Sequence, residues 1–379
     1  MPDSPYFNPV VWESREFYRD AAPAAISAVE RIIQAGILSN GSEVAAFEQE
    51  VASFVNTNYG IAVSSCTVGL TLAVKLLAPR KRVLVPSFTF CATALSVLWN
   101  ESQIVFGKID PETFNLDFEW AKKMVANHHV DAILFLATAG SVAGLVQFQD
   151  LADFYGIPLI IDAAGALGSH DGSSLLSSKA NIVSVVSFAS KKPLPIGEGG
   201  MLLTNNSDIA DALRRLRVYG SIDGYYCVET GLNGRMSEIN AAIGREFLKH
   251  LPEVLQKRRI VAMRIAKESQ SIVRWQRVDY AQQSSYADLL CVVDRLLRPI
   301  LLASFNQAGI EAVPFYDPPV ARHPAFRFSQ LISLCAEVSE QLEDLAGTTF
   351  AFRPTSSYTD AHAKQIIGLL KSLTPNAQR

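Results

Sequence analysis

The chain has 379 residues, 49% of them hydrophobic and 19% charged, which is typical of a globular protein with one large domain and a smaller one. A net charge of −3 excludes the strongly basic surface that binds nucleic acid or an anionic membrane. The five cysteines and six histidines lack metal-ligand spacing, so we expect reduced thiols, a cytoplasmic protein and no metal site.

Two regions of the chain bear on whether the protein is targeted to a membrane. The first residues, MPDSPYFNPVVWESREF, have no basic start followed by an apolar core, so we expect no signal peptide. The stretch VLVPSFTFCATALSVLW (83–99) is short and interrupted by Pro, Ser and Thr. It therefore predicts a buried strand that leads into a helix, rather than a membrane span.

The first clear helical pattern covers residues 40–54. Asn40 and Glu43 have the spacing of a capping box at its start. Four apolar residues fall on one face of this predicted helix: Val44, Phe47, Val51 and Phe54.

Short apolar runs then alternate with helical patterns. The predicted buried strands cover residues 83–85, 104–106, 132–137, 157–161 and 182–186, and the predicted helices cover 67–77, 89–98 and 148–155. Near-continuous apolar strands separated by helices favour a mostly parallel sheet with helices on both faces. Because such sheets bind ligands at the carboxyl ends of their strands, we expect chemistry just after residues 85, 137, 161 and 186.

The pattern changes from Ser237 onward. Apolar residues from Ile239 to Leu251 predict one long helix, and a mixture of strands and helices follows. We therefore expect a large domain over residues 1–244, whose N-terminal segment could pack on the other domain, and a small C-terminal domain over 245–379.

A carboxylate follows the predicted strand that ends at residue 161. Asp162 needs a cationic or hydrogen-bonding partner there, because an unpaired buried carboxylate would be neutralised. It is either a strand-end residue that caps the next turn or an acid held for the protonated ring nitrogen of a cofactor.

Small polar side chains lie at two further places in the chain. One helical pattern is directly preceded by Ser64, Ser65, Cys66 and Thr67, and Ser187 follows the predicted strand that ends at residue 186. Small residues at a helix N-terminus either form an anion site with the backbone N–H groups or only cap the helix.

An aromatic residue and two lysines complete the set. Phe90 either stacks on a flat ring or fills the core. The segment SFASKKPLPIGEGG places Lys191 and Lys192 among few other charges, and a desolvated lysine is a good nucleophile. Pyridoxal 5'-phosphate (PLP) requires this combination: an amine, an acid for the ring nitrogen, a phosphate site and a stacking face.

Seven motifs occur in the order found in one enzyme family: GSEV, VSSCT, PSFTF, DAAGALG, SFASKK, GEGG and GLNGRMSE. Over most of its length the chain resembles the nucleotide-sugar aminotransferase family (DegT/DnrJ/StrS type) of fold-type-I PLP enzymes, and the resemblance weakens beyond about residue 250. The resemblance implies an α/β fold, with a mostly parallel central sheet flanked by helices in the large domain and a smaller C-terminal α+β domain.

The resemblance also implies roles for individual residues. Lys192 is the catalytic residue that forms the Schiff base with PLP, and Asp162 pairs with the pyridinium. The implied cofactor-binding set is Ser65, Cys66, Thr67 and Ser187 around the phosphate, Phe90 over the ring, and Asn233 from the neighbouring subunit. A homodimer with shared active sites follows.

The chain departs from the family pattern at several positions near the site. Gly165 replaces a Gln or His, Cys66 a glycine, Ala189 a histidine and Tyr219 a common histidine. Lys191, in place of a threonine, is either a solvated neighbour or a charge that activates Lys192. These changes could retune the cofactor, admit a different substrate or accompany a diverged reaction.

The resemblance implies transfer of an amino group, with glutamate as the expected donor, to C3 or C4 of a keto-6-deoxy sugar nucleotide. The alternatives are a keto-cyclitol acceptor, a PLP enzyme of another type (elimination, dehydration or carbon–carbon bond formation) and a non-catalytic regulatory homologue. Arg217 and Arg235 are phosphate partners by charge or structural residues. Segment 314–326 is expected near the substrate.

Overall fold

The computed structural model describes residues 15–170, 181–278, 283–327, 329–354 and 358–373. Residues 1–14, where we expect no signal peptide, lie outside these ranges. Within the described ranges, no helix is long and apolar enough to cross a membrane. The same residues contain no group of three or more His, Cys, Asp or Glu side chains that could hold a metal ion.

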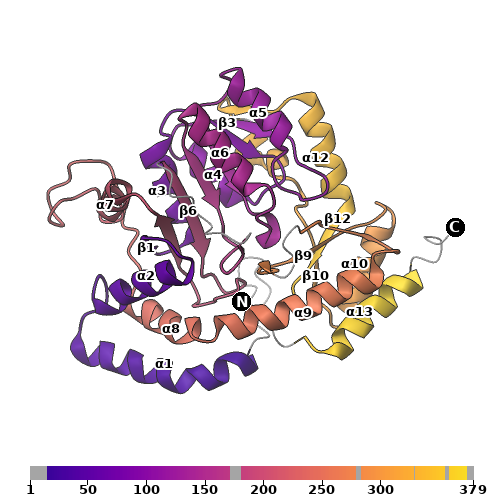
Figure 1. The fold of residues 1–379 in the computed structure, drawn as a ribbon, viewed down its shortest axis with the longest axis horizontal. Coiled ribbons are helices and arrows are strands. Elements are labelled where there is room, and N and C mark those ends of the chain that lie inside the picture. Colours follow the sequence, from indigo (N-terminus) through magenta and orange to yellow (C-terminus); the bar gives the residue numbers. More distant parts are fainter. Residues whose placement is uncertain (1–14, 171–180, 279–282, 328, 355–357, 374–379) are drawn as a thin grey trace.

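An eight-stranded sheet forms the centre of the large part of the molecule (Figure 1). Its strands are, in spatial order, β1 (Tyr59–Val63), β7 (Gly200–Thr204), β6 (Ile182–Ser187), β5 (Leu159–Asp162), β4 (Ala132–Leu136), β2 (Arg82–Pro86), β3 (Gln103–Gly107) and β11 (Ile332–Ser333). All neighbouring pairs are parallel except those of β7, which runs antiparallel to β1 and β6. The expected fold class and its five predicted strands are confirmed; β1 and β7 were not predicted.

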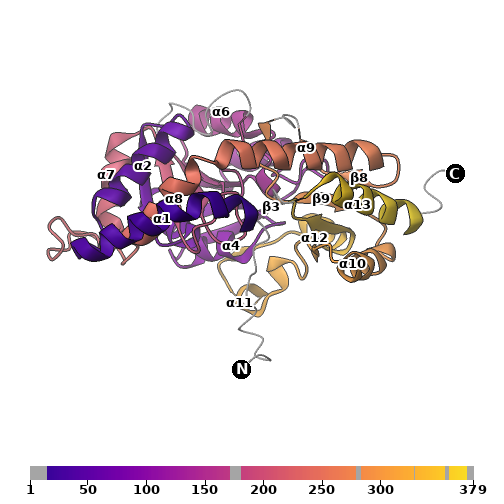
Figure 2. The ribbon, with the colours of Figure 1, turned by 90° about the horizontal axis from the view of Figure 1, so that it is seen from below.

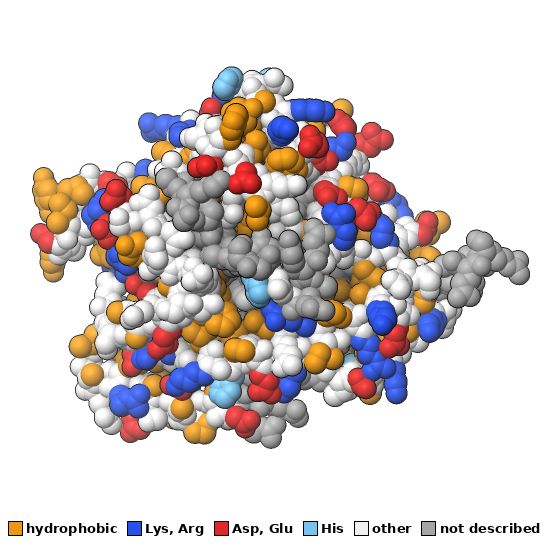
Figure 3. All heavy atoms as spheres, viewed as in Figure 1, with side chains coloured by type: hydrophobic (Ala, Val, Ile, Leu, Met, Phe, Trp, Pro, Cys, Tyr) orange, Lys and Arg blue, Asp and Glu red, His pale blue; other side chains and the backbone are white. Residues whose placement is uncertain are grey.

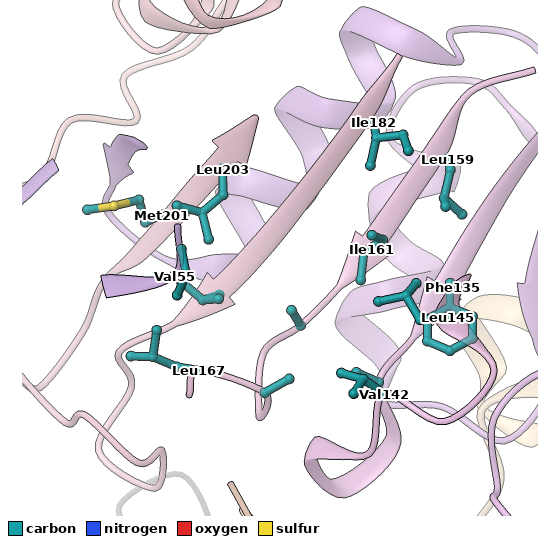
Figure 4. Packing of buried hydrophobic residues seen from close by; sticks show 14 of the residues in the cluster. Val55, Phe135, Val142, Leu145, Leu159, Ile161, Leu167, Ile182, Met201 and Leu203 are labelled. Carbon is teal, nitrogen blue, oxygen red and sulfur yellow. The ribbon is translucent and has the colours of Figure 1, made fainter. Parts of the chain in front are cut away.

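Helices cover both faces of this sheet. One face carries α2 (Ser42–Phe54), α5 (Phe118–Ala126), α6 (Leu145–Tyr155) and α8 (Glu238–Leu248), and the other α3 (Cys66–Leu77), α4 (Cys91–Leu98) and α7 (Ser207–Leu216). The strands alternate between the two faces: Leu159 and Ile161 join the first core, and Ile160 joins the second. Figure 4 shows part of the first core, in which Leu159 and Ile161 of β5 lie on the same face of the sheet as Phe135 and Leu145.

The start of α2 differs from the prediction. Gly41 is its N-cap, and Asn40 adopts a left-handed backbone conformation (φ 55°) without capping the helix. Instead, the Glu238 carboxylate accepts hydrogen bonds from the backbone N–H groups of Gly41, Glu43 and Val44 at 2.8–3.1 Å. A negative side chain is favourable there because the helix dipole is positive at its N-terminus. The predicted capping box is therefore wrong, and the cap comes from a residue far along the chain.

The single long helix expected after Ser237 is two helices. Helix α8 ends at Leu248, and α9 (Leu251–Ser269) begins three residues later with Pro252 in its first turn. Proline fits the first turn of a helix but cannot continue one, because it lacks the N–H group. Helix α1 (Arg15–Ala35) packs against α8 on the outside of the molecule (Figure 1).

A second, four-stranded antiparallel sheet lies beside the first. Its strands are, in spatial order, β10 (Ala312–Pro314), β12 (Thr349–Phe352), β9 (Leu289–Val292) and β8 (Arg274–Trp275). Three helices share a core with it: α9, α10 (Leu297–Gln307) and α13 (Asp360–Leu373). Figure 2 shows α9 reaching from the large part of the molecule toward this sheet.

One part of the C-terminal third returns to the large sheet. Strand β11 pairs with β3, and the side chains of Val320, Phe326 and Val338 lie in the second core of the large sheet. They come from η3 (Val320–Arg322), α11 (Pro324–Arg327) and α12 (Ala336–Thr348). The domain boundary at residues 244/245 remains a prediction. These C-terminal residues lie after that boundary in the sequence but pack on the large sheet.

We predict that Glu238→Ala destabilises the protein by about 3 kcal/mol, because three backbone N–H groups lose a charged acceptor. The matched control is Glu253→Ala, which removes an exposed ion pair to Lys257 on α9 and should leave the unfolding midpoint close to that of the wild type. Urea denaturation of both variants measures the difference. Equal midpoints for the two variants would show that the cap contributes nothing.

Candidate active site

The predicted site residues lie at one edge of the large sheet. The parallel strands β1, β2, β4, β5 and β6 end there, and the antiparallel strand β7 begins there with Gly200. The structure brings Lys192, Asp162 and Cys66 within electrostatic reach of one another. The charge of Lys192 lowers the pKa of both other groups, and that of Asp162 raises the pKa of the Cys66 thiol.

Asp162 is the last residue of β5, and its side chain is buried. Its Oδ2 accepts a hydrogen bond from Thr93 Oγ1 at 2.7 Å, and its Oδ1 accepts one from the Ala164 N–H at 3.1 Å. Burial raises the pKa of Asp162, and these two hydrogen bonds and the charge of Lys192 oppose that rise. No described residue forms an ion pair with this carboxylate, so it fits a ligand that brings its own positive charge, such as a protonated pyridine nitrogen.

The start of α3 forms the proposed phosphate cradle. Ser65 is its N-cap, and its hydroxyl oxygen accepts a hydrogen bond from the Val68 N–H at 3.2 Å. Gly200 lies so close that a Cβ atom there would be 2.6 Å from the Cys66 backbone nitrogen. Only glycine allows β7 to approach the helix start in this way. The first backbone amides of α3, together with the half-buried Thr67, fit an anion at this edge.

Cys66 can contribute to such a cradle only through its backbone. Its side chain is buried, and its Sγ lies 3.8 Å from the Val185 carbonyl oxygen, away from the end of the helix. Burial raises the pKa of the thiol well above its usual value, so the group is an inert thiol rather than a nucleophile.

The loop after β6 carries the two lysines. Ser187 is buried at the end of the strand, and its Oγ accepts a hydrogen bond from the Ala189 N–H at 3.3 Å. The Lys192 side chain is half-buried, and its backbone N–H donates to the Ala189 carbonyl at 2.9 Å. Lys191 is exposed, as expected for a solvated neighbour. Lys192 is the lysine whose charge acts on the buried Asp162 and Cys66.

Phe90 does not fill the core. It is the N-cap residue of α4 and is 58% exposed. Its ring centroid lies 6.5 Å from that of Tyr316, a half-buried residue of the loop after β10. An exposed aromatic face beside the site is available for stacking on a planar ligand.

The departure from the family pattern at Gly165 has a structural explanation, and the one at Tyr219 has none beyond its contact with Arg235. A Cβ atom on Gly165 would lie 2.9 Å from the Cβ of Ala287, and Ser285 Oγ donates to the Gly165 carbonyl at 2.6 Å. The segment before β9 therefore occupies the space that a larger side chain at position 165 would need. Tyr219 adopts a positive φ of 62°, and the guanidinium of Arg235 lies 5.5 Å from the centroid of its ring.

Arg217 is a structural residue rather than a free phosphate partner. Its guanidinium forms a largely buried ion pair with Glu48 and donates to the Ala62 carbonyl at 2.7 Å. Asn233 is exposed at the surface, where it forms a β-bridge with Val218. Within the single chain it is free to meet another molecule.

Two residues of the C-terminal third, Asp288 and Tyr316, also act electrostatically on the site and were not predicted. Asp288 pairs with Arg353 at 3.1 Å; burial raises the pKa of Asp288, and the charges of Arg353 and Lys192 oppose the rise. Burial also raises the pKa of the Tyr316 phenol, and the charges of Asp288 and Asp162 raise it further. Asp288 directly precedes an apolar strand, a signal of the kind that identified Asp162. Tyr316 falls in the 314–326 segment but has no distinguishing sequence pattern.

A sheet that ends in a half-buried lysine, a buried carboxylate and an amide cradle is typical of PLP-dependent transferases of the α/β class. The chain matches the DegT/DnrJ/EryC1/StrS aminotransferase family over residues 20–371, and it belongs to that family. The expectation of an enzyme, an aminotransferase that uses PLP, is confirmed.

Individual relatives agree with this assignment. The chain is 29% identical over 302 residues to the UDP-2-acetamido-2-deoxy-3-oxo-D-glucuronate aminotransferase of Pseudomonas aeruginosa, covering 78% of this chain and 83% of the relative. It is 28% identical over 335 residues to a UDP-4-amino-4,6-dideoxy-N-acetyl-beta-L-altrosamine transaminase of Campylobacter jejuni, covering 84% and 86%. A DegT DnrJ EryC1 StrS aminotransferase from Brucella abortus shares the fold, with a TM-score of 0.87 at 24% identity over 97% of this chain and 100% of the other.

We predict that Asp162→Asn stabilises the cofactor-free protein increasingly as pH rises. The folded-state pKa of Asp162 is raised, so its contribution to stability is full below the unfolded pKa of about 3.9 and is lost as pH rises through the folded value. Thermal unfolding of the wild-type and variant apo-proteins between about pH 4.5 and 8 measures the difference in melting temperature. A difference independent of pH would mean that the carboxylate is not strained by burial.

Proposed function

We propose that the protein transfers an amino group from glutamate to C3 or C4 of a keto-6-deoxy sugar attached to a nucleoside diphosphate. The observation that carries the proposal is the proximity of a half-buried Lys192 to a buried Asp162 with which no described residue forms an ion pair. The names of the relatives support the acceptor class, because the proteins of P. aeruginosa and C. jejuni described above are named for UDP-linked amino or keto sugars.

The chemistry divides between the cofactor and the chain. When bound, PLP supplies a carbonyl that takes up the amino group and an electron-withdrawing ring. Lys192 Nζ would hold the cofactor and, as a free amine, would take the proton from the donor Cα. Asp162 would stabilise the positive charge of the ring nitrogen, and the hydroxyls of Ser65, Thr67 and Ser187 with the first amides of α3 would bind the phosphate.

A homodimer in the cytoplasm, with residues exchanged between active sites, completes the proposal. An arm that follows α7 projects from the body of the molecule (Figure 1), and hydrophobic side chains gather at its tip (Figure 3). Ile222 and Tyr226 are each 69% exposed, and Tyr225 is 94% exposed. Exposed apolar clusters of this kind mark protein interfaces. Asn233 lies on the chain segment that returns from this arm, which supports its proposed reach into a neighbouring site.

We predict that glutamate discharges the visible absorbance band of the lysine-bound cofactor in the wild-type enzyme and that Lys192→Ala abolishes this response, because no amine remains to hold the cofactor or move the proton. The matched control is Lys191→Ala, which removes an exposed neighbouring amine and should respond at close to the wild-type rate. Stopped-flow absorbance measures both. A band that glutamate leaves unchanged would favour elimination, dehydration or carbon–carbon bond formation instead.

We predict that Lys192→Ala and Asn233→Ala homodimers are each impaired and that mixing them after mild unfolding restores activity. Heterodimers place both changes in one shared site and leave the other site intact, so an equal mixture should recover about a quarter of the wild-type activity. Glutamate-dependent amination of a keto sugar nucleotide measures the recovery. A mixture no more active than the mean of its parents would place Asn233 in its own subunit's site or outside it.

A further inference from the structure

Thr93 is the one side chain that donates a hydrogen bond to Asp162 among the described residues, at 2.7 Å from Oγ1 to Oδ2. It is fully buried on the first turn of α4, and neither the family motifs nor the proposed mechanism gives it a role. We propose that Thr93 is a positioning residue that keeps the Asp162 carboxylate ionised and aligned for the ring nitrogen of PLP, and thereby sets the affinity for the cofactor. This inference rests on the proposed role of Asp162.

The geometry leaves Asp162 little freedom to turn. A carboxylate has about four lone-pair sites, and here each oxygen accepts one hydrogen bond, from the Ala164 backbone on Oδ1 and from Thr93 on Oδ2. Two donors on different oxygens fix the rotation of the group and leave lone pairs for one further cationic partner. Without the threonine hydroxyl, the carboxylate would be held on one side only.

The same turn of α4 also carries Phe90. The Thr93 N–H donates to the Phe90 carbonyl at 3.2 Å, and Ser96 Oγ donates to the Thr93 carbonyl at 2.7 Å. Thr93 therefore connects the acid for the ring nitrogen to the residue proposed to cover the ring. A cofactor that contacts both groups would meet a single rigid unit.

The Thr93 hydroxyl matters because it stabilises the charged form of Asp162. Burial raises the pKa of Asp162, which forms no ion pair with any residue that the structure describes. Each hydrogen bond to the charged carboxylate opposes this rise, and the one from Thr93 opposes it most. Hydrogen bonds to charged groups contribute more than neutral ones. Removing this donor should therefore weaken PLP binding and raise the pH below which binding is lost.

The test is the dissociation constant of PLP for the apo-protein, measured by equilibrium dialysis between about pH 5 and 9. We expect Thr93→Val, which keeps the shape but removes the donor, to weaken binding roughly ten-fold or more and to shift the acid limb of the profile to higher pH. Thr93→Ser, which keeps the hydroxyl, should retain most of the affinity and the wild-type profile. Ser102→Ala is the matched control, since it removes a buried hydroxyl that donates to the Ala78 and Asn100 carbonyls and contacts neither Thr93 nor Asp162 through a hydrogen bond.

A double-mutant cycle separates this proposal from the one on which it rests. If Thr93 acts through Asp162, Thr93→Val should have little further effect on PLP binding in an Asp162→Asn background. An equal loss in both backgrounds, or wild-type affinity and pH profile in Thr93→Val alone, would overturn the positioning role. Wild-type affinity in Asp162→Asn would instead overturn the role of Asp162 itself. If Thr93→Val proves insoluble, Thr93→Ala removes the same donor and is judged by the same outcomes.

Discussion

The active site depends on one costly feature, a negative charge buried at the end of a central strand. Asp162 has neutral donors on both oxygens but no ion pair among the described residues. A buried charge is stable only if nearby polar groups replace its interactions with water. For Asp162 these groups are the Thr93 hydroxyl on the first turn of α4, the Ala164 N–H in the turn after β5 and the ammonium of Lys192. In the proposed function, the protonated ring nitrogen of PLP would add a positive charge next to this carboxylate.

Short-range patterns revealed the half of the site that the large sheet carries. Asp162 and Ser187 end β5 and β6, which are apolar runs, and such runs identify a strand and its carboxyl end together. The VSSCT motif was recognised instead from its small polar residues before a helical pattern, because β1 was not predicted. The part of the site that the small sheet carries gave only the weak local signal at Asp288, because its arrangement depends on contacts between distant segments. Asp288 and Arg353 are 65 residues apart in sequence and meet only because β9 and β12 are neighbours in the small sheet.

The difference between local patterns and contacts of distant segments also explains the errors in the predicted fold. The helix at 40–54 was recognisable from its periodicity, but its cap lies 194–197 residues away in Glu238 and leaves no local trace. Pro252 did carry a local signal for the helix boundary, and the regular apolar spacing obscured it. At Gly165 the sequence showed an unusual glycine, but only the packing of Ala287 gives the reason for it.

The segment from Asn233 to Glu238 joins three distant parts of its own chain. Asn233, Arg235 and Ser237 form β-bridges with Val218, Val63 and Ser39 respectively, and Glu238 then closes the start of α2. Alternate residues are thus fixed at a spacing of two along an extended strand, with the exposed Asn233 at one end and a helix cap at the other. Inserting or deleting one residue would shift every later bridge to the wrong face. The length of this segment therefore fixes the distance between the exposed loop after α7 and the start of α2, and a side chain within it can change without altering that distance.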